Sequence, residues 1–230
     1  MCYTIYPIGD SALQIKFKVP NAQTLHQITA TLQHNLLDGV YDIVPGLETI
    51  TLFYHYPKTN YQELAKTVTK IMEAPQKTVN KLPTRTLYIP TLYDGPDLQE
   101  VADFHKTTTE KIIETHSAQI YEVSMLGFLP GFPYLNGLSP SLHTPRKKEP
   151  RLHVESGSIG IGGESTGIYP ISSPGGWNLI GRTSVSLFSL EEEQPFLFQQ
   201  GDKVKFVRVS KLTKTKREDV IFYENNGFEL

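Results

Sequence analysis

Residues 126–182 read LGFLPGFPYLNGLSPSLHTPRKKEPRLHVESGSIGIGGESTGIYPISSPGGWNLIGR. Eleven of the 17 glycines and seven of the 16 prolines of the chain lie in this stretch. An α-helix is strongly disfavoured here, because an interior glycine costs about 1 kcal/mol relative to alanine and an interior proline about 3 kcal/mol. Short strands separated by sharp turns remain, so the stretch predicts an all-β sandwich or barrel.

The residues before this stretch predict a smaller unit of mixed secondary structure. Hydrophobic and polar residues alternate at 13–17 and 50–54, as in half-buried strands, and residues 40–44 form a short apolar run. Helical spacing follows the first and the last of these strands, and Asn60 with Glu63 has the spacing of a capping box. The order strand–helix–strand–strand–helix predicts a ferredoxin-like layer of two helices on an antiparallel sheet.

A boundary is expected between these two parts, so the chain as a whole is predicted to be α+β. The segment 73–83 is polar and contains two prolines, which is typical of a linker. It separates a small α/β domain, residues 1–80, from a second domain, residues 84–230. The second domain is expected to begin with two short helices within residues 97–117. Two pairs with capping-box spacing lie there, Asp97 with Glu100 and Thr107 with Glu110.

The composition argues against several classes of protein. Hydrophobic residues make up 39% and charged residues 20%, as in an ordinary globular protein. The net charge of −2 and the lack of a basic stripe with interleaved aromatic residues argue against a nucleic-acid partner. No apolar stretch is long enough for a membrane span, and residues 1–10 lack the features of a secretory signal, so we expect a cytoplasmic protein. The seven histidines show no metal-ligand spacing, so no metal site is expected.

Two motifs in the glycine-rich stretch suggest chemistry that their surroundings do not support. Gly160-Ile161-Gly162-Gly163 has Ser165 where a dinucleotide fingerprint needs glycine, and Ile168 stands where a P-loop needs lysine. We expect these glycines to serve turns and close backbone approach. Residues 163–167 match the G-x-S-x-G nucleophile elbow, but that motif requires a following helix, and none is expected here.

Arginine and aromatic side chains are the candidate binding residues. Arg146 and Arg151 each follow a proline, which keeps the segment extended and presents the guanidinium groups outward. A guanidinium binds carboxylate or phosphate through two parallel hydrogen bonds, so an anion site and a plain basic surface loop are both open interpretations. Five aromatic residues among the turns predict an apolar cleft for a small ligand: Phe128, Phe132, Tyr134, Tyr169 and Trp177.

The segment Gly127-Phe128-Leu129-Pro130-Gly131-Phe132-Pro133-Tyr134-Leu135 resembles the GFxPGFPYL block of the 5-oxoprolinase B-subunit family. This family is also labelled allophanate hydrolase subunit 1, and it includes KipI-type inhibitors of a sensor histidine kinase. Further matching blocks follow in the family's order and extend the resemblance over essentially the whole chain: Gly9–Leu13, Thr144–Arg146, Pro150-Arg151, Gly157–Gly163, Thr166–Pro170, Ser173–Trp177 and Leu179–Thr183. Ser165 departs from the family's usual Gln, and Glu155-Ser156 replaces its usual Pro-Ala.

The resemblance implies a fold and an activity. It implies that the second domain is a cyclophilin-like β-barrel, preceded by the small α/β domain. It also implies one subunit of an enzyme, inactive without its partners, which are a homologous C subunit and a separate A subunit. Together these open the lactam of 5-oxo-L-proline to L-glutamate, and they use ATP to activate the lactam carbonyl.

Residue roles can then be suggested from side-chain chemistry and motif position. Arg146 or Arg151 would hold the substrate carboxylate or a phosphate, and Arg182 would serve the developing charge. Thr166 and Tyr169 would hydrogen-bond the lactam. Two alternatives stay open at this point: an inhibitor that docks on a sensor histidine kinase through the aromatic turns, and a subunit of a urea- or allophanate-type amidohydrolase.

Overall fold

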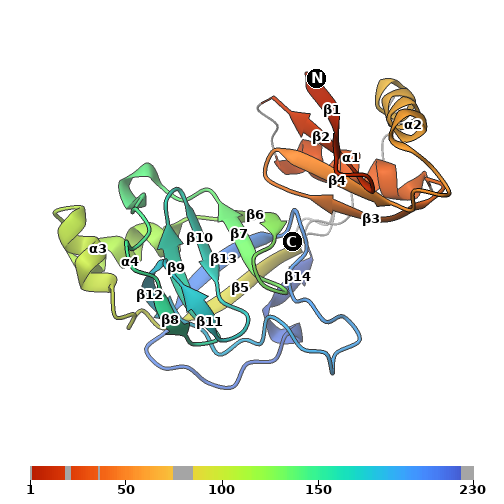
Figure 1. The fold of residues 1–230 in the computed structure, drawn as a ribbon. Helices are drawn as coiled ribbons and strands as arrows, with labels where there is room; N and C mark the ends of the chain where they lie inside the picture. The colour runs from red at the N-terminus through yellow and green to blue at the C-terminus, as the bar shows by residue number, and fades with distance from the viewer. Residues whose placement is uncertain (1, 19–21, 36, 75–84, 224–230) are drawn as a thin grey trace, which may run out of the picture. The chain divides into compact units, whose positions relative to one another are not determined.

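The computed structural model describes residues 2–18, 22–35, 37–74 and 85–223 (Figure 1). The chain divides into two compact units, Met1–Leu82 and Pro83–Leu230, and each is described by itself. The expected linker at 73–83 lies almost wholly outside the described residues.

The first unit is a four-stranded antiparallel sheet with two helices. Its sheet order is β1-β2-β4-β3. The elements are β1 (Tyr3–Ile8), β2 (Ala12–Phe17), α1 (Ala22–His34), β3 (Val40–Pro45), β4 (Thr49–Tyr54) and α2 (Tyr61–Glu73). Inward residues of β2 and β4 share one hydrophobic core with Leu25, Ile28 and Leu32 of α1 and with Leu64 and Val68 of α2. Both helices therefore cover the same face of the sheet.

The expected strands and helices of this unit are confirmed, but β1 was not foreseen. Its sequence YTIYPI contains Pro7, which cannot donate a ladder hydrogen bond and is tolerated mainly in edge strands. The strand lies at the edge of the sheet, paired only with β2. The predicted cap of α2 is also confirmed, because the Asn60 side chain accepts a hydrogen bond from the Glu63 N–H at 3.0 Å.

The second unit combines sheet and helix, which confirms the predicted α+β class for the chain. It begins with β5 (Arg85–Thr91), α3 (Leu98–Phe104) and α4 (Thr109–Ala118). Its remaining elements are β6 (Tyr121–Leu126), β7 (Pro133–Asn136), η1 (Pro140–Leu142), β8 (Arg151–Val154), β9 (Ser158–Gly162), β10 (Ser165–Ile168), β11 (Ser173–Gly175), β12 (Asn178–Arg182), β13 (Lys203–Arg208), η2 (Glu218–Val220) and β14 (Ile221–Tyr223).

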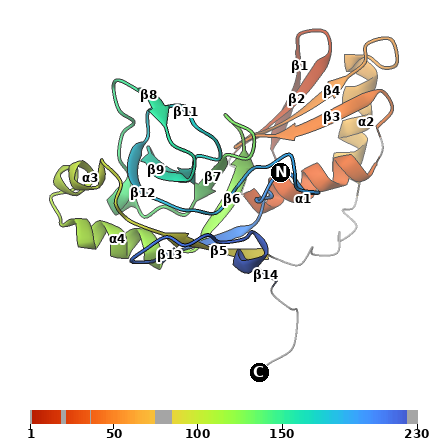
Figure 2. The same ribbon diagram turned by 90° about the horizontal axis from the view of Figure 1, so that it is seen from below.

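The sheet of the second unit is open, whereas a closed barrel was expected. Its order is β12-β9-β10-β7-β6-β13-β5-β14, and β13 and β5 run parallel side by side (Figure 2). β13 pairs along one side of β5, β14 pairs with Arg85–Leu87, and β12 forms no ladder with β5. An isolated bridge joins β12 to the residue that follows β5, where Leu92 and Arg182 exchange backbone hydrogen bonds of 2.9 and 2.8 Å. Strands β8 and β11 form a separate two-stranded ribbon.

The two helices of the second unit differ from expectation at their first residues. The cap of α4 is Thr108, one residue later than predicted, and its side chain accepts from the Lys111 N–H at 3.2 Å. Asp97 precedes α3, but its side chain makes no capping hydrogen bond. The carboxylate of Asp97 has other partners, described below. None of the helices in the described part of the chain has both the length and the hydropathy needed to cross a bilayer.

Candidate active site

The five predicted aromatic residues come together in one cluster, which we call the aromatic cluster. It consists of Phe128, Phe132, Tyr134, Tyr169 and Trp177. The Phe132 ring is central, with its centroid 5.2 Å from Tyr169, 5.3 Å from Trp177 and 5.7 Å from Phe128. Tyr134 packs against it at 5.1 Å and against Trp177 at 5.8 Å. Near-perpendicular rings at such distances add to the stability that their burial provides.

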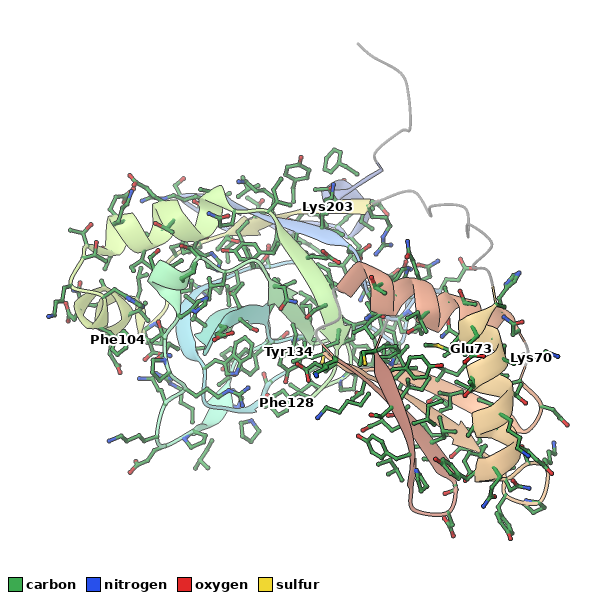
Figure 3. The ribbon with its side chains drawn as sticks, turned by 90° about the horizontal axis from the view of Figure 1, so that it is seen from above. Lys70, Glu73, Phe104, Phe128, Tyr134 and Lys203 are labelled. Carbon is green, nitrogen blue, oxygen red and sulfur yellow. The ribbon has the colours of Figure 1, made fainter. Side chains whose placement is uncertain are left out.

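The cluster is packed, and the open apolar cleft that the sequence suggested is not formed by these five rings. Phe132, Tyr169 and Trp177 are buried, because they fill the space between β9–β10 and the β8–β11 ribbon. Tyr134 is half-buried and Phe128 is 62% exposed (Figure 3). Only Phe128 and Tyr134 therefore offer substantial ring surface to a ligand or partner.

Glycine makes the room that the Trp177 indole occupies. A Cβ atom added to Gly162 on β9 would lie 2.5 Å from the indole ring, closer than a carbon atom can approach. The Gly160–Gly163 segment thus serves close packing, and β10 follows it as a strand, in place of the helix that holds phosphate in nucleotide sites. Ser165 starts β10 opposite Gly162 in an antiparallel hairpin, so the nucleophile-elbow interpretation is wrong.

Arg146 is exposed and lies above the aromatic cluster. Its guanidinium carbon is 5.9 Å from the centroid of the Trp177 ring, which is cation–π distance. The backbone on both sides is fixed, because Asn178 Nδ2 donates to the Pro145 carbonyl at 2.9 Å and the Lys147 N–H donates to the Gly176 carbonyl at 2.8 Å. No carboxylate among the described residues forms an ion pair with Arg146.

Arg151, by contrast, already has an acidic partner. Its Nη2 donates to Asp97 Oδ1 at 2.5 Å, and Lys147 Nζ lies 3.0 Å from the same oxygen. The other oxygen, Oδ2, accepts from the Leu179 N–H at 2.7 Å. Burial would raise the pKa of Asp97, but the hydrogen bonds from Arg151, Leu179 and Lys147 outweigh burial and hold that pKa below its usual value. Asp97 is therefore a buried, ionised carboxylate.

Arg182 is paired as well, with an acid at the surface. Its Nε and Nη2 donate to the Asp94 carboxylate at 3.0 and 2.7 Å on the surface. The expected catalytic role of Arg182 thus has no support from its surroundings. The structure separates the three predicted arginines into two that are neutralised by acids and one, Arg146, that is not.

The acids that pair with the arginines come from one turn, Asp94-Gly95-Pro96-Asp97. A Cβ on Gly95 would lie 2.3 Å from the Leu179 carbonyl oxygen, so only glycine lets this turn lie directly against β12. The Gly95 N–H donates to the Ile180 carbonyl at 3.2 Å and the Asp97 N–H to the Leu179 carbonyl at 3.0 Å. The sequence interpretation identified neither acid as the partner of an arginine, since they are 88 and 54 residues from Arg182 and Arg151. The only sign of this turn in the sequence was the pair of aspartates on either side of Gly95-Pro96.

Thr166 is fully buried, and its hydroxyl is used inside the protein. It donates to the Gly160 carbonyl at 2.9 Å, so His116 Nε2, 3.0 Å away, is the donor to Thr166. His116 Nδ1 then accepts from the Tyr93 hydroxyl at 2.8 Å. Burial lowers the pKa of His116 to about 3, so the ring is neutral. The suggested hydrogen bond from Thr166 to a lactam is therefore not supported.

Tyr169 is similarly enclosed. Burial raises the pKa of its hydroxyl, and a Cβ on Gly175 would lie 2.3 Å from that oxygen, so β11 covers it. Direct contact of the Tyr169 hydroxyl with a lactam is not supported either. Across the described ranges, no group of His, Cys, Asp and Glu side chains is arranged to hold a metal ion.

Comparison with known proteins defines the class to which this fold and site belong. Residues 3–198 match the family model of the carboxyltransferase domain, subdomain C and D. The 5-oxoprolinase B subunit of Haemophilus influenzae is 42% identical over 88% of this chain and 96% of its own length. That of Bacillus subtilis is 38% identical over 90% of this chain and 93% of its own length. The chain belongs to the 5-oxoprolinase B-subunit family.

Two further comparisons show how this unit occurs in other chains. The solved structure of TTHA0988 is similar with a TM-score of 0.77 and 32% identity over 88% of this chain. The match spans only 40% of that solved chain. The urea amidolyase of Lachancea kluyveri is 40% identical over 65 residues, which is 26% of this chain. The sequence likeness to that urea amidolyase is thus confined to a small part of the chain.

Replacing Gly162 by alanine is expected to displace Trp177. The added methyl group cannot fit beside the indole, so the protein should lose about 1–3 kcal/mol of stability in urea unfolding. Trp177 is the only tryptophan, so its fluorescence emission should move to longer wavelength as the ring becomes hydrated. The matched control is Gly176→Ala, whose Cβ would meet its nearest atom at an ordinary 3.6 Å. Unchanged emission in Gly162→Ala would contradict the packing role.

Phe128 has an unusual backbone conformation that can be tested directly. Its φ of 71° is left-handed, which costs a side chain with a Cβ about 1–2 kcal/mol. Phe128→Gly should therefore be more stable than Phe128→Ala by about 1 kcal/mol in urea unfolding, since both lack the ring and only alanine keeps the strain. In ordinary strand or helix backbone the order is the reverse. An alanine variant as stable as the glycine variant would show that residue 128 is unstrained.

Proposed function

We propose that this chain is the B subunit of an ATP-dependent 5-oxoprolinase. It acts with the A and C subunits to open 5-oxo-L-proline to L-glutamate, and it is inactive without them. The similarity to proteins named as this B subunit, over nearly their whole length, supports the activity. One structural observation carries the assignment of the site: the guanidinium of Arg146, which makes no ion pair within the described residues, is held above the aromatic cluster.

Charge explains why Arg146 is the preferred ligand for an acid. Arg151 and Arg182 each share their charge with an aspartate, so a substrate carboxylate would have to displace that aspartate before binding. Arg146 needs no such exchange, and its planar donors match a carboxylate in two parallel hydrogen bonds. The Trp177 face beneath it limits the motion of the guanidinium, which lowers the entropy lost on binding.

The shape of 5-oxoproline suits this surface. The molecule has a carboxylate at one end and a small lactam ring at the other. Arg146 would hold the carboxylate, while Tyr134 and Phe128 present the exposed apolar surface against which the ring can lie. A few polar anchors beside apolar side chains are the usual composition of a small-molecule site.

Phosphoryl transfer from ATP supplies the activation of the lactam carbonyl, and we assign the binding of ATP to the other subunits of the enzyme. Gly160 and Gly162 pack against Trp177 and do not form a phosphate cradle. The part of this chain is to bind and orient the acid beside that reaction. Holding a substrate in a reactive geometry can by itself contribute several kcal/mol to catalysis.

A contact surface for another subunit, next to the site, is part of the proposal. Phe128 is exposed in a strained conformation, and strained residues persist where they serve a contact. The related unit in TTHA0988 occupies 40% of a longer chain, which supports a second body working beside it. We assign that place to the homologous C subunit, which would close the site over Arg146.

The finer description of the fold belongs to the same proposal. In the first unit β4 lies between β2 and β3, as in a ferredoxin-like layer, and β1 takes the place of that fold's last strand. We take the second unit to be an opened version of the cyclophilin-like barrel, joined by the Leu92–Arg182 bridge. The two domains would be residues 1–80 and 84–230, and a cytoplasmic location stays a prediction.

Inhibition of a sensor histidine kinase and a urea- or allophanate-type role stay as alternatives to lactam opening.

Arg146→Ala is expected to weaken substrate binding in the reconstituted enzyme. A hydrogen bond to a charged group is worth about 1.5–3 kcal/mol, so the KM for 5-oxoproline should rise roughly 10- to 100-fold. The measurement is 5-oxoproline-dependent release of ADP by this chain mixed with the A and C subunits.

Lys148→Ala provides the matched control, because Lys148 is an exposed cation two residues away on the same segment. Its removal should leave KM within about twofold, since isolated surface charges contribute little. Equal effects of the two substitutions would reduce the site to a general basic patch. An unchanged KM in Arg146→Ala would remove Arg146 from the substrate site.

A further inference from the structure

We propose that Asp97 is a positioning residue for Arg146: its buried carboxylate fixes the segment 144–151 and pairs with Lys147 and Arg151, so that Arg146 is the guanidinium of the segment left without an ion pair for an acid. This inference deepens the proposed function, and it rests on that function only where it concerns the substrate. The positioning itself can be tested without partners or activity.

The carboxylate of Asp97 is anchored on β12, which is separate from the segment 144–151. Asp97 is 2% exposed, and its Oδ2 is held by the Leu179 N–H on β12, at 2.7 Å. The close fit of Gly95 against the same strand fixes the turn that carries Asp97. The remaining oxygen, Oδ1, is therefore presented at a defined point, where Arg151 and Lys147 meet it.

Lys147 connects this anchor to the neighbouring Arg146. Its ammonium lies 3.0 Å from Asp97 and 2.7 Å from Glu100, and its side chain is only 19% exposed. Hydrogen bonds from these acids raise the pKa of Lys147, with Glu100 making the larger contribution. The ion pairs of Lys147 hold its side chain against the start of α3. They thereby fix the backbone at 146–147 in the orientation that places the Arg146 side chain over Trp177.

The rest of the segment is tied down in the same way. At its start, Thr144 exchanges backbone hydrogen bonds with Gly163, and its hydroxyl lies 3.0 Å from His105 Nε2. At its end, Arg151 is bonded to Asp97. Between these points, the acids hold Lys147, while Arg146 makes no ion pair within the described residues.

The arrangement also explains why one cation is selected from several. Arg146, Lys147 and Arg151 lie within six residues of one another, and any of them could bind a carboxylate. Asp97 forms ion pairs with two of them in a buried place, and Glu100 shares the charge of Lys147. An incoming acid then meets one guanidinium without an ion pair, that of Arg146, whereas Arg151 is held by Asp97 and keeps only its buried Nη1 without a hydrogen-bond partner.

The test uses the purified chain with Trp177 as its built-in reporter. Asp97→Asn should free the segment that covers Trp177, and the acrylamide quenching constant of the Trp177 fluorescence should rise at least about twofold, since a looser cover admits the quencher. Lys147→Met removes the ion pair between Lys147 and Asp97 but keeps Asp97 paired with Arg151. This variant should therefore fold even if Asp97→Asn does not. It should show the same increase in the quenching constant. Lys148→Met is the matched control, because it makes the same change at the exposed lysine next to Lys147.

In the reconstituted enzyme, Lys147→Met should raise the KM for 5-oxoproline about as much as Arg146→Ala does, with a smaller effect on kcat at saturation. Lys148→Met should leave both constants and the quenching unchanged. Unchanged quenching in a folded Lys147→Met protein would overturn the positioning role. Increased quenching combined with an unaffected KM in both Lys147→Met and Arg146→Ala would keep the positioning role and reject the substrate site, so the two failures are distinguishable.

Discussion

The docking of the Asp94–Asp97 turn against β12 is the constraint on which the rest of the site depends. It requires Gly95, because any Cβ there would collide with the backbone of β12. Once the turn is in place, Asp97 reaches Arg151 and Lys147, and Asp94 reaches Arg182. A backbone contact that only glycine permits thus determines where the charges of three distant basic side chains are neutralised.

The aromatic cluster and the charge network support each other. Trp177 fits only because Gly162 leaves room beneath it, and its outer face then carries the Arg146 guanidinium. The segment that bears Arg146 is bonded to Asn178 and Gly176, which flank Trp177 in sequence. Packing therefore fixes the position of the Trp177 ring. The ion pairs of Arg151 and Lys147 leave Arg146 as the guanidinium without an ion pair above that ring. In our proposal this chain binds a small acid, and such a surface has the charge and the apolar area to do so.

Sequence periodicity predicted the elements whose cause is local. The alternating strands of the first unit, the Asn60 cap and the β-rich character of residues 126–182 all follow from neighbouring residues. It missed β1, because Pro7 is tolerated there only by virtue of an edge position that the sequence does not reveal.

Long-range contacts set the limits of prediction for the site. The aromatic residues that the sequence singled out lie together in the structure, but Thr166 and Tyr169 are buried, and Arg151 and Arg182 form ion pairs with distant aspartates. The most direct test of the account is a double-mutant cycle on unfolding with Asp97→Asn, Arg151→Gln and the double variant. A buried pair predicts a coupling free energy of about 2 kcal/mol, with the double variant more stable than the sum of the single losses implies. Losses that add to within about 0.5 kcal/mol would contradict it.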